Sequence, residues 1–74
     1  MTLEDECVAI LAKQMGPAAK IFLMRQCQRH LQKMASQIQR QDLPELAKLC
    51  FAGTQSTLGV PAAESIRKGI LEIK

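Results

Sequence analysis

Cys27 and His30 have the spacing best suited to shared chemistry in this chain. Residues three apart lie on one face of a helix, where a thiolate and an imidazole could bind a metal ion or act as nucleophile and base. A structural zinc site needs four ligands, and no Cys-x-x-Cys or His-x-x-x-His motif supplies the other two. Cys7 and Cys50 would have to reach the same point. We therefore predict no metal site and no catalytic residue.

The rest of the sequence also argues against an enzyme. Its 74 residues contain no Gly-rich phosphate loop and no dinucleotide fingerprint, and so short a chain has little room for a catalytic pocket. The three Cys are an odd number set among apolar residues, which is typical of reduced, buried thiols in a cytoplasmic protein. We therefore expect a cytoplasmic protein with no cofactor and no small-molecule substrate.

No targeting segment is expected at the N-terminus. The stretch Met1–Glu6 is acidic, whereas a signal peptide begins with basic residues. The longest apolar run, Cys7–Ala12, is far shorter than a membrane span. We therefore predict no contact with a membrane.

Composition and periodicity predict an all-α fold, with residues 1–74 as a single domain. The chain is 47% hydrophobic but has two Phe and no Trp or Tyr, so the predicted core is aliphatic. Many Ala and Met with few β-branched residues favour helix over strand. The expected architecture is a small bundle of four helices over residues 3–15, 17–40, 43–52 and 61–73.

Gly16 and Pro17 set the predicted joint between the first two helices. Gly16 suits the left-handed residue that ends a helix, and Pro17 suits the first turn of the next one. Thr2 is the predicted N-cap of the first helix, with acidic residues in its first turn. The second helix is predicted to bury a face that recurs every three or four residues: Ile21, Met24, Cys27, Leu31, Met34 and Ile38.

The second half of the chain is punctuated by Pro and Gly. Asp42 is a predicted N-cap, Pro44 lies in the first turn of the third helix, and Gly53 is expected to end that helix. The Ser/Thr/Gly-rich stretch 54–60 is predicted to be a loop. Gly69 inside the last helix either permits close packing or weakens it. Whether 61–73 is integral to the fold or a separable arm stays open.

The best functional interpretation is a non-enzymatic module for protein docking or assembly. Apolar residues run nearly around the helix at 7–12 and again at 21–24, more than a few short helices need for their own core. The flexible side chains of Met15, Met24 and Met34 would suit an adaptable contact surface. The predicted partner is a helix of another protein or a second copy in a homodimer. The predicted partner-binding residues are Val8, Leu11, Met15, Phe22 and Leu23. In the alternative, the fourth helix folds across and hides the second apolar face.

A second interpretation is a small basic regulator that binds nucleic acid. The second helix carries the cations that such a regulator would use: Arg25, Arg29, Lys33 and Arg40. The net charge of +3 is mild, and the predicted helix is longer than a usual recognition helix. A solvated polar face explains these residues more simply.

The stretch Leu11–Arg25 resembles a known domain family. It is similar to a small, uncharacterised helical domain at the C-terminus of many bacterial signalling proteins, including serine/threonine kinases and multidomain regulators. The resemblance implies a helical fold with an appended role in signalling or assembly, and it implies no catalytic residue. The tail from Gly53 onward lies outside the pattern. The residues that match it are Met15, Gly16, Pro17, Ala19, Lys20 and Arg25.

Overall fold

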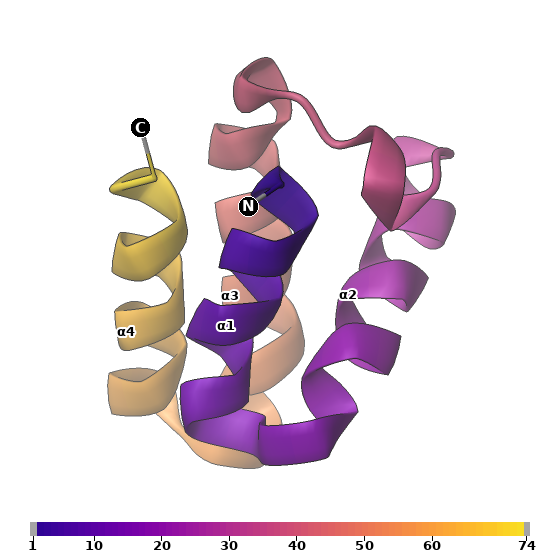
Figure 1. Cartoon of the computed structure of the whole chain (residues 1–74). Helices are drawn as coiled ribbons and strands as arrows, with labels where there is room; N and C mark the ends of the chain where they lie inside the picture. The colour runs from indigo at the N-terminus through magenta and orange to yellow at the C-terminus, as the bar shows by residue number, and fades with distance from the viewer. Residues whose placement is uncertain (1, 74) are drawn as a thin grey trace.

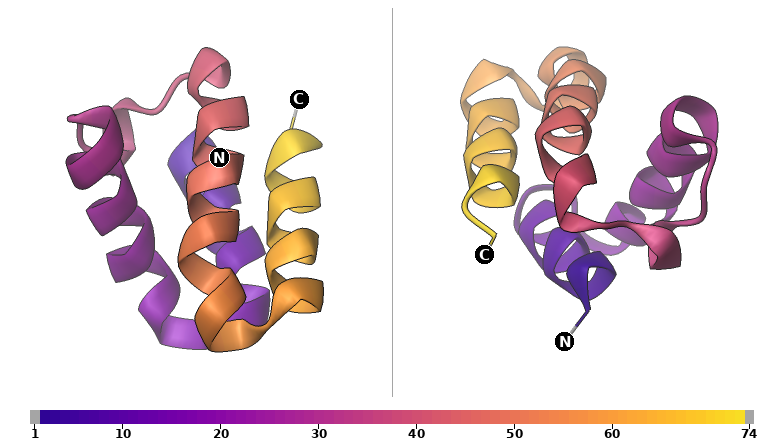
Figure 2. Two further views of the ribbon diagram at one scale, coloured as in Figure 1. Left: turned by 180° about the vertical axis from the view of Figure 1, so that it is seen from behind. Right: turned by 90° about the horizontal axis from the view of Figure 1, so that it is seen from above.

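Four α-helices, each antiparallel to the one before it, form residues 2–73, which confirms the predicted all-α class (Figure 1). The structure is a computed structural model and describes residues 2–73. The helices are α1 (Leu3–Met15), α2 (Ala19–Gln26), α3 (Leu43–Leu58) and α4 (Val60–Leu71). Helix α3 packs closely on α4, α1 contacts α2 and α4, and α2 contacts α3. Seen from above, α2 and α4 lie on opposite sides of the molecule (Figure 2).

Helix α1 has the predicted bounds because its two ends carry strong local signals. The Asp5 N–H donates to Thr2 Oγ1 at 3.1 Å, and Asp5 Oδ2 accepts from the Thr2 N–H at 3.4 Å, which completes a capping box. Gly16 ends the helix with a φ of 64°, and its N–H donates to the Ala12 carbonyl. A short 3-10 turn, η1 (Gly16–Ala18), then reverses the chain into α2.

The predicted long helix 17–40 is wrong, because the chain leaves the helix after Leu31. Helix α2 gives way to a π-helical turn, η2 (Cys27–Leu31), which ends at Gln32 in the left-handed conformation with φ 54°. The 8 residues of α2 and the 5 of η2 together match the 13 residues of α1. A longer helix would extend beyond its neighbours into water.

The chain after Gln32 turns back to reach the start of α3. Two 3-10 turns, η3 (Ala35–Gln37) and η4 (Arg40–Asp42), make this connection. Ala35 and Ile38 of this connection are buried in the core. Lys33 Nζ lies 2.8 Å from Asp42 Oδ2, and Asp42 also accepts from the Gln39 N–H at 3.0 Å. This ion pair ties the two ends of the connection together.

The predicted boundary at Gly53 and the predicted loop 54–60 are also wrong, since α3 continues to Leu58. A Cβ at position 53 would lie 2.9 Å from Cζ of Phe22, so Gly53 allows α2 and α3 to approach closely. Thr54 is fully buried, and its hydroxyl donates to the Cys50 carbonyl at 2.7 Å. Such a bond to the preceding turn lets Thr sit inside a helix without an unsatisfied hydroxyl. The turn between α3 and α4 is confined to Gly59, whose φ is 91°.

All four helices contribute to one core. Its fully buried side chains include Leu11 of α1, Leu23 of α2, Leu46 of α3, and Ile66 and Ile70 of α4. Helix α4 therefore buries its apolar face in the same core as the other three helices. The core is aliphatic, as the composition predicts.

The helical run Leu3–Leu31 meets the length and composition of a membrane span. In this structure the run reverses at Gly16, and its two halves lie antiparallel as α1 and α2 (Figure 1). Leu11 and Leu23, one from each half, are fully buried within the bundle. The apolar character of this run therefore contributes to the core of the fold.

Candidate docking face

The residues predicted to bind a partner lie mostly inside the fold. Leu11 and Leu23 have no exposed surface, so the prediction that they form a docking surface is wrong for this folded state. Val8, Met15 and Phe22 are half-buried and pack against the core. The physical reason is that α3 and α4 cover the second apolar side of α1 and α2. This arrangement agrees with the alternative prediction, in which the fourth helix folds across and hides the second apolar face.

Helix α2 is rotated relative to its predicted orientation. Its buried side chains are Ala19 and Leu23, and Phe22 packs beside Gly53. Ile21 and Met24, which were predicted to face the core, are 58% and 38% exposed. The rotation follows from packing, because Gly53 gives the Phe22 ring a place on α3 that Ile21 cannot use at the same time.

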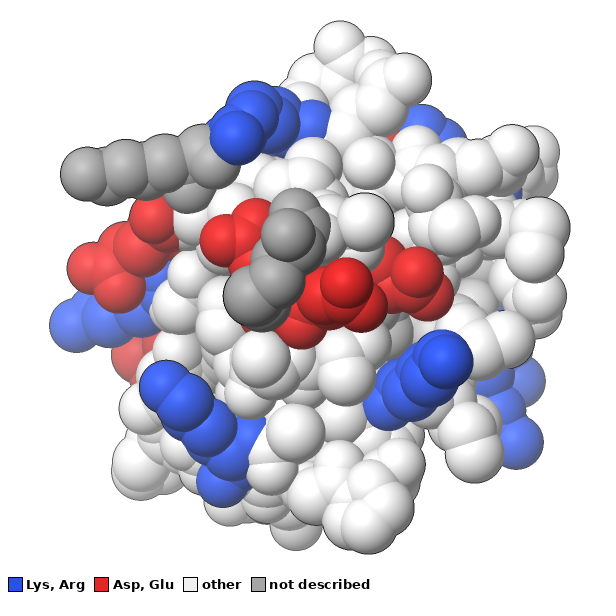
Figure 3. All heavy atoms as spheres, viewed as in Figure 1, with Lys and Arg blue, Asp and Glu red and all other residues white. Residues whose placement is uncertain are grey.

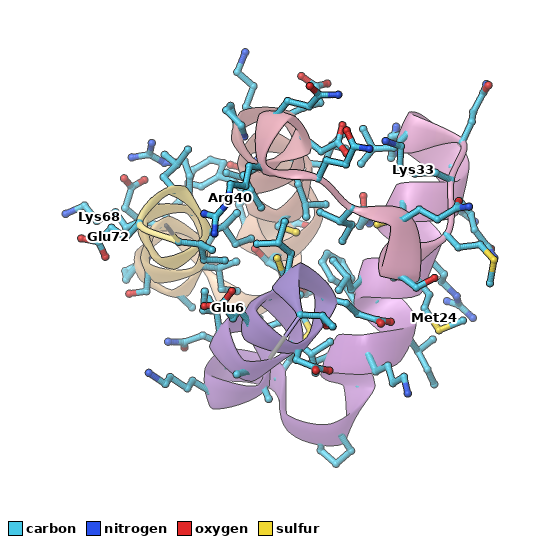
Figure 4. All side chains as sticks on the ribbon, turned by 45° about the horizontal axis from the view of Figure 1, so that its top comes forward. Glu6, Met24, Lys33, Arg40, Lys68 and Glu72 are labelled. Atoms are coloured by element: carbon cyan, nitrogen blue, oxygen red, sulfur yellow. The ribbon has the colours of Figure 1, made fainter. Side chains whose placement is uncertain are left out.

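Ile21 and Met24 form an apolar stripe on the outer side of α2. They are three residues apart and therefore neighbours on the helix surface, and Figure 4 shows Met24 pointing away from the bundle. Full burial of an Ile or Met side chain is worth about 1.5–3 kcal/mol, much of which this fold leaves unused. Val60 and Leu71 are also exposed, but they stand near opposite ends of α4.

Cations stand on both sides of this stripe. At 100° per residue, Lys20 falls on one side of Ile21 and Met24, and Arg25 and Arg29 fall on the other. All three cations are exposed. We call the five side chains of Lys20, Ile21, Met24, Arg25 and Arg29 the docking face.

The docking face lies in a stretch of sequence that has no acidic residue. Residues 7–41 contain six Lys and Arg and no Asp or Glu. In Figure 3, acidic side chains gather over the start of α1, while the right-hand edge of the molecule, on the side of α2, shows only basic and uncharged side chains. This separation of charge was present in the sequence and could have indicated the surface before the fold was known.

A shallow, open pocket of about 350 Å³ adjoins the docking face at the end of α2. Gln28, which lines it, lies one turn beyond Met24 on the same side of the helix. Met34, which is 58% exposed, also lines it. Three side-chain amides give the pocket hydrogen-bonding capacity, and it is lined by Gln28, Gln32, Lys33, Met34 and Gln37.

Backbone irregularities coincide with this pocket. The π-helical turn Cys27–Leu31 leads into it, and Gln32 is the one residue other than glycine with a positive φ within residues 2–73. Such turns and left-handed residues concentrate at functional sites. Sequence reasoning missed both features, because an uninterrupted helical pattern runs through them.

The structure does not gather the residues of the nucleic-acid interpretation into one surface. Arg25 and Arg29 are exposed on α2 and η2. Lys33 is engaged by Asp42, and the Lys33 ammonium lowers the pKa of the Asp42 carboxyl. Figure 4 shows Arg40 extending toward α4, away from Lys33 and Met24.

The three thiols lie in the core and not at a reactive site. Cys7, Cys27 and Cys50 are fully buried, and burial raises the pKa of all three, to about 12 for Cys7 and Cys50. They are therefore protonated at neutral pH and poor nucleophiles. His30 is exposed while Cys27 is buried, so the two do not face one point. Within residues 2–73, no group of three or more His, Cys, Asp or Glu is arranged to hold a metal ion.

Comparison with known proteins adds no relative. No protein-family model, no curated protein and no solved structure matches this chain. The resemblance to the helical domain of bacterial signalling proteins therefore stays a prediction.

Proposed function

We propose that this chain is a non-enzymatic protein-docking module and that the docking face on α2 is its binding surface. The observation that carries the proposal is the apolar stripe of Ile21 and Met24. These two side chains are exposed between cations, and the buried core of the bundle forms without them. Protein interfaces combine an apolar centre with a polar rim, and Met and Arg are enriched in them. The stripe with its flanking cations has this composition.

The docking face differs from the predicted surface but keeps the predicted kind of function. Met24 and Met34, predicted to suit an adaptable contact, are both exposed, Met24 in the stripe and Met34 in the pocket. The resemblance to a domain of bacterial signalling proteins supplies the proposed context, an appended role in cytoplasmic signalling or assembly. A second copy of the chain remains an alternative partner.

Affinity capture with matched variants tests the proposal. The double variant Ile21→Ser/Met24→Ser removes the apolar stripe, and Val60→Ser/Leu71→Ser removes two exposed apolar residues on α4. We expect wild type and the α4 variant to retain the same partner from a lysate of the native host, and the α2 variant to lose it. Equal capture by both variants would contradict the proposal. Circular dichroism checks that each variant is folded.

Nucleic-acid binding is the second candidate, and the acid-free stretch 7–41 favours it. Six cations without a carboxylate among them would attract phosphate groups. Its distinguishing sign is DNA or RNA binding that weakens steeply with salt and survives Ile21→Ser/Met24→Ser. Absence of any gel shift at low salt would exclude this candidate.

A further inference from the structure

The docking face combines an apolar centre with flanking cations, and the helix fixes the positions of both. Ile21 and Met24 form the centre, with Lys20 on one side and Arg25 and Arg29 on the other. The nearest carboxylate along the chain on the C-terminal side is Asp42, which is held by Lys33 at 2.8 Å. The three cations of the docking face therefore have no ion-pair partner within residues 2–73.

We infer that the partner of this face is an acidic amphipathic helix of another protein. This inference rests on the docking function proposed above. Such a helix would lie along α2 with its apolar residues over Ile21 and Met24. Its Asp and Glu side chains, on both edges of its apolar stripe, would meet Lys20 on one side and the arginines on the other. Arg binds carboxylates with two parallel hydrogen bonds, which adds geometric selectivity to the charge attraction.

The apolar centre argues against nucleic acid as the occupant. Ile21 and Met24 cannot hydrogen-bond phosphate. Because they lie between the cations of the two sides, one continuous nucleic-acid backbone would not contact both sets of cations. Stacking on bases needs aromatic side chains, and of the two Phe residues in the chain, Phe22 is half-buried against Gly53. The same centre is what a helix with an apolar stripe requires.

A second copy of the chain fits this face less well. Three of its seven acidic side chains are already engaged: Asp5 in the capping box, Asp42 with Lys33, and Glu64 with Arg67. Two copies would also each bring a net charge of +3 to the contact. Charge complementarity therefore points to a partner richer in acid than this chain.

Selection from a random peptide library identifies the chemistry without knowledge of the natural partner. The full chain, immobilised through a terminal tag, is the target, and peptides about 20 residues long allow several helical turns. We expect the enriched peptides to be acidic, with apolar residues at helical spacing. Their binding should weaken at least about tenfold in Ile21→Ser/Met24→Ser and several-fold between low and high salt. Val60→Ser/Leu71→Ser should bind as wild type does.

Charge reversal supplies the sharper test. In Lys20→Glu/Arg25→Glu/Arg29→Glu, which reverses the charge on both edges of the docking face, the acidic peptides should lose binding, and copies with every Glu and Asp replaced by Lys should gain it. Failure of the variant to bind the Lys-substituted peptides would overturn the inference, because attraction of charge would then not decide recognition. All three substituted positions are exposed, and circular dichroism verifies the helical fold.

The outcomes separate this inference from the function on which it rests. Enriched peptides that are basic or uncharged, but still depend on Ile21 and Met24, overturn the acidic helix and leave the docking function standing. Binding that no α2 variant affects overturns both, and so does the absence of any enriched peptide.

Three parallel probes cover the other occupants. A fluorescent DNA duplex or vesicles of anionic lipid that bind wild type and Ile21→Ser/Met24→Ser equally would overturn the inference in favour of those surfaces. A dimer in light scattering that this variant abolishes would assign the face to a second copy.

Discussion

Gly69 of α4 faces Ile10 of α1 so closely that a methyl group on Gly69 would lie 2.8 Å from Ile10 Cγ2. Glycine inside a helix costs about 1 kcal/mol relative to alanine, so the chain gives up helix propensity here. What it gains is contact between α1 and α4, with Ile66 and Ile70 fully buried on α4. The structure thus favours close packing over weakening as the role of Gly69.

We expect Gly69→Ala to destabilise the protein although alanine is the better helix former. Overpacking a tight contact costs about 1–3 kcal/mol, which exceeds the gain in helix propensity. The clashing atom is the β-branch of Ile10, which is stiff in a helix and cannot move away easily. Urea unfolding should show a midpoint lower than that of wild type.

Ile10→Leu provides the matched background, because leucine lacks the Cγ2 branch. In Ile10→Leu, the additional change Gly69→Ala should cost at least about 1 kcal/mol less than it does in wild type. Equal effects in the two backgrounds would show that the contact is not the cause.

Gly16 and Gly59 are expected to be required for backbone conformation alone. Both have positive φ, 64° and 91°, and neither would bring a Cβ within 3.4 Å of a neighbouring atom. Replacing either by L-alanine should destabilise the protein by about 1–3 kcal/mol. Thermal unfolding of each variant measures this effect.

D-Alanine is the stereochemical control, and a chain of 74 residues is within reach of chemical synthesis. A D-residue prefers positive φ, so D-alanine at position 16 should restore most of the stability that L-alanine removes. If both enantiomers destabilise equally, the side chain and not the backbone conformation is responsible.

The buried thiols should make the protein sensitive to alkaline pH. Burial raises the pKa of Cys7 and Cys50 from 9.0 to about 12, so between these values the unfolded chain loses protons that the folded chain keeps. Stability is then fully present below pH 9 and decreases as the pH rises. At pH 10 the two thiols together should reduce the free energy of unfolding by roughly 3 kcal/mol relative to pH 7.

Urea unfolding from pH 7 to 10.5 measures this decline, and no tyrosine is present to titrate in the same range. The variant Cys50→Ala starts from lower stability but should decline less steeply. An unchanged slope in that variant would rule out the thiols as the cause.

Lys33 and Asp42 should stabilise the connection between η2 and α3. Hydrogen bonds from Lys33 and from the Gln39 N–H lower the pKa of Asp42, so this contribution is present above the carboxyl's ordinary pKa and is lost as the pH falls through the folded-state value. Lys33→Met should cost up to about 1 kcal/mol at pH 7 and little in acid.

Lys48→Met removes an exposed lysine that makes no ion pair within residues 2–73. Thermal unfolding of this control should match wild type at every pH. If Lys33→Met remains less stable than wild type in strong acid, lost packing and not the ion pair explains its effect.

The amino-acid sequence by itself determined the all-α class and the elements with local signals. Thr2 and Asp5 fix the start of α1, and Gly16 with Pro17 fixes the reversal after it, because capping groups and backbone preferences act within a few residues. The aliphatic character of the core follows from composition. The absence of acid between residues 7 and 41 was also available from the sequence alone.

Tertiary structure decided where helices end in the absence of such signals and which sides of them face water. The end of η2 at Leu31, before the left-handed Gln32, depends on the length of α1, and the continuation of α3 past Gly53 depends on the ring of Phe22. The exposure of Ile21 and Met24 follows from the same contact, since burying Phe22 against α3 turns them outward. Periodicity shows that a helix has an apolar side, but when apolar residues surround it, only the neighbouring helices select which of them are buried.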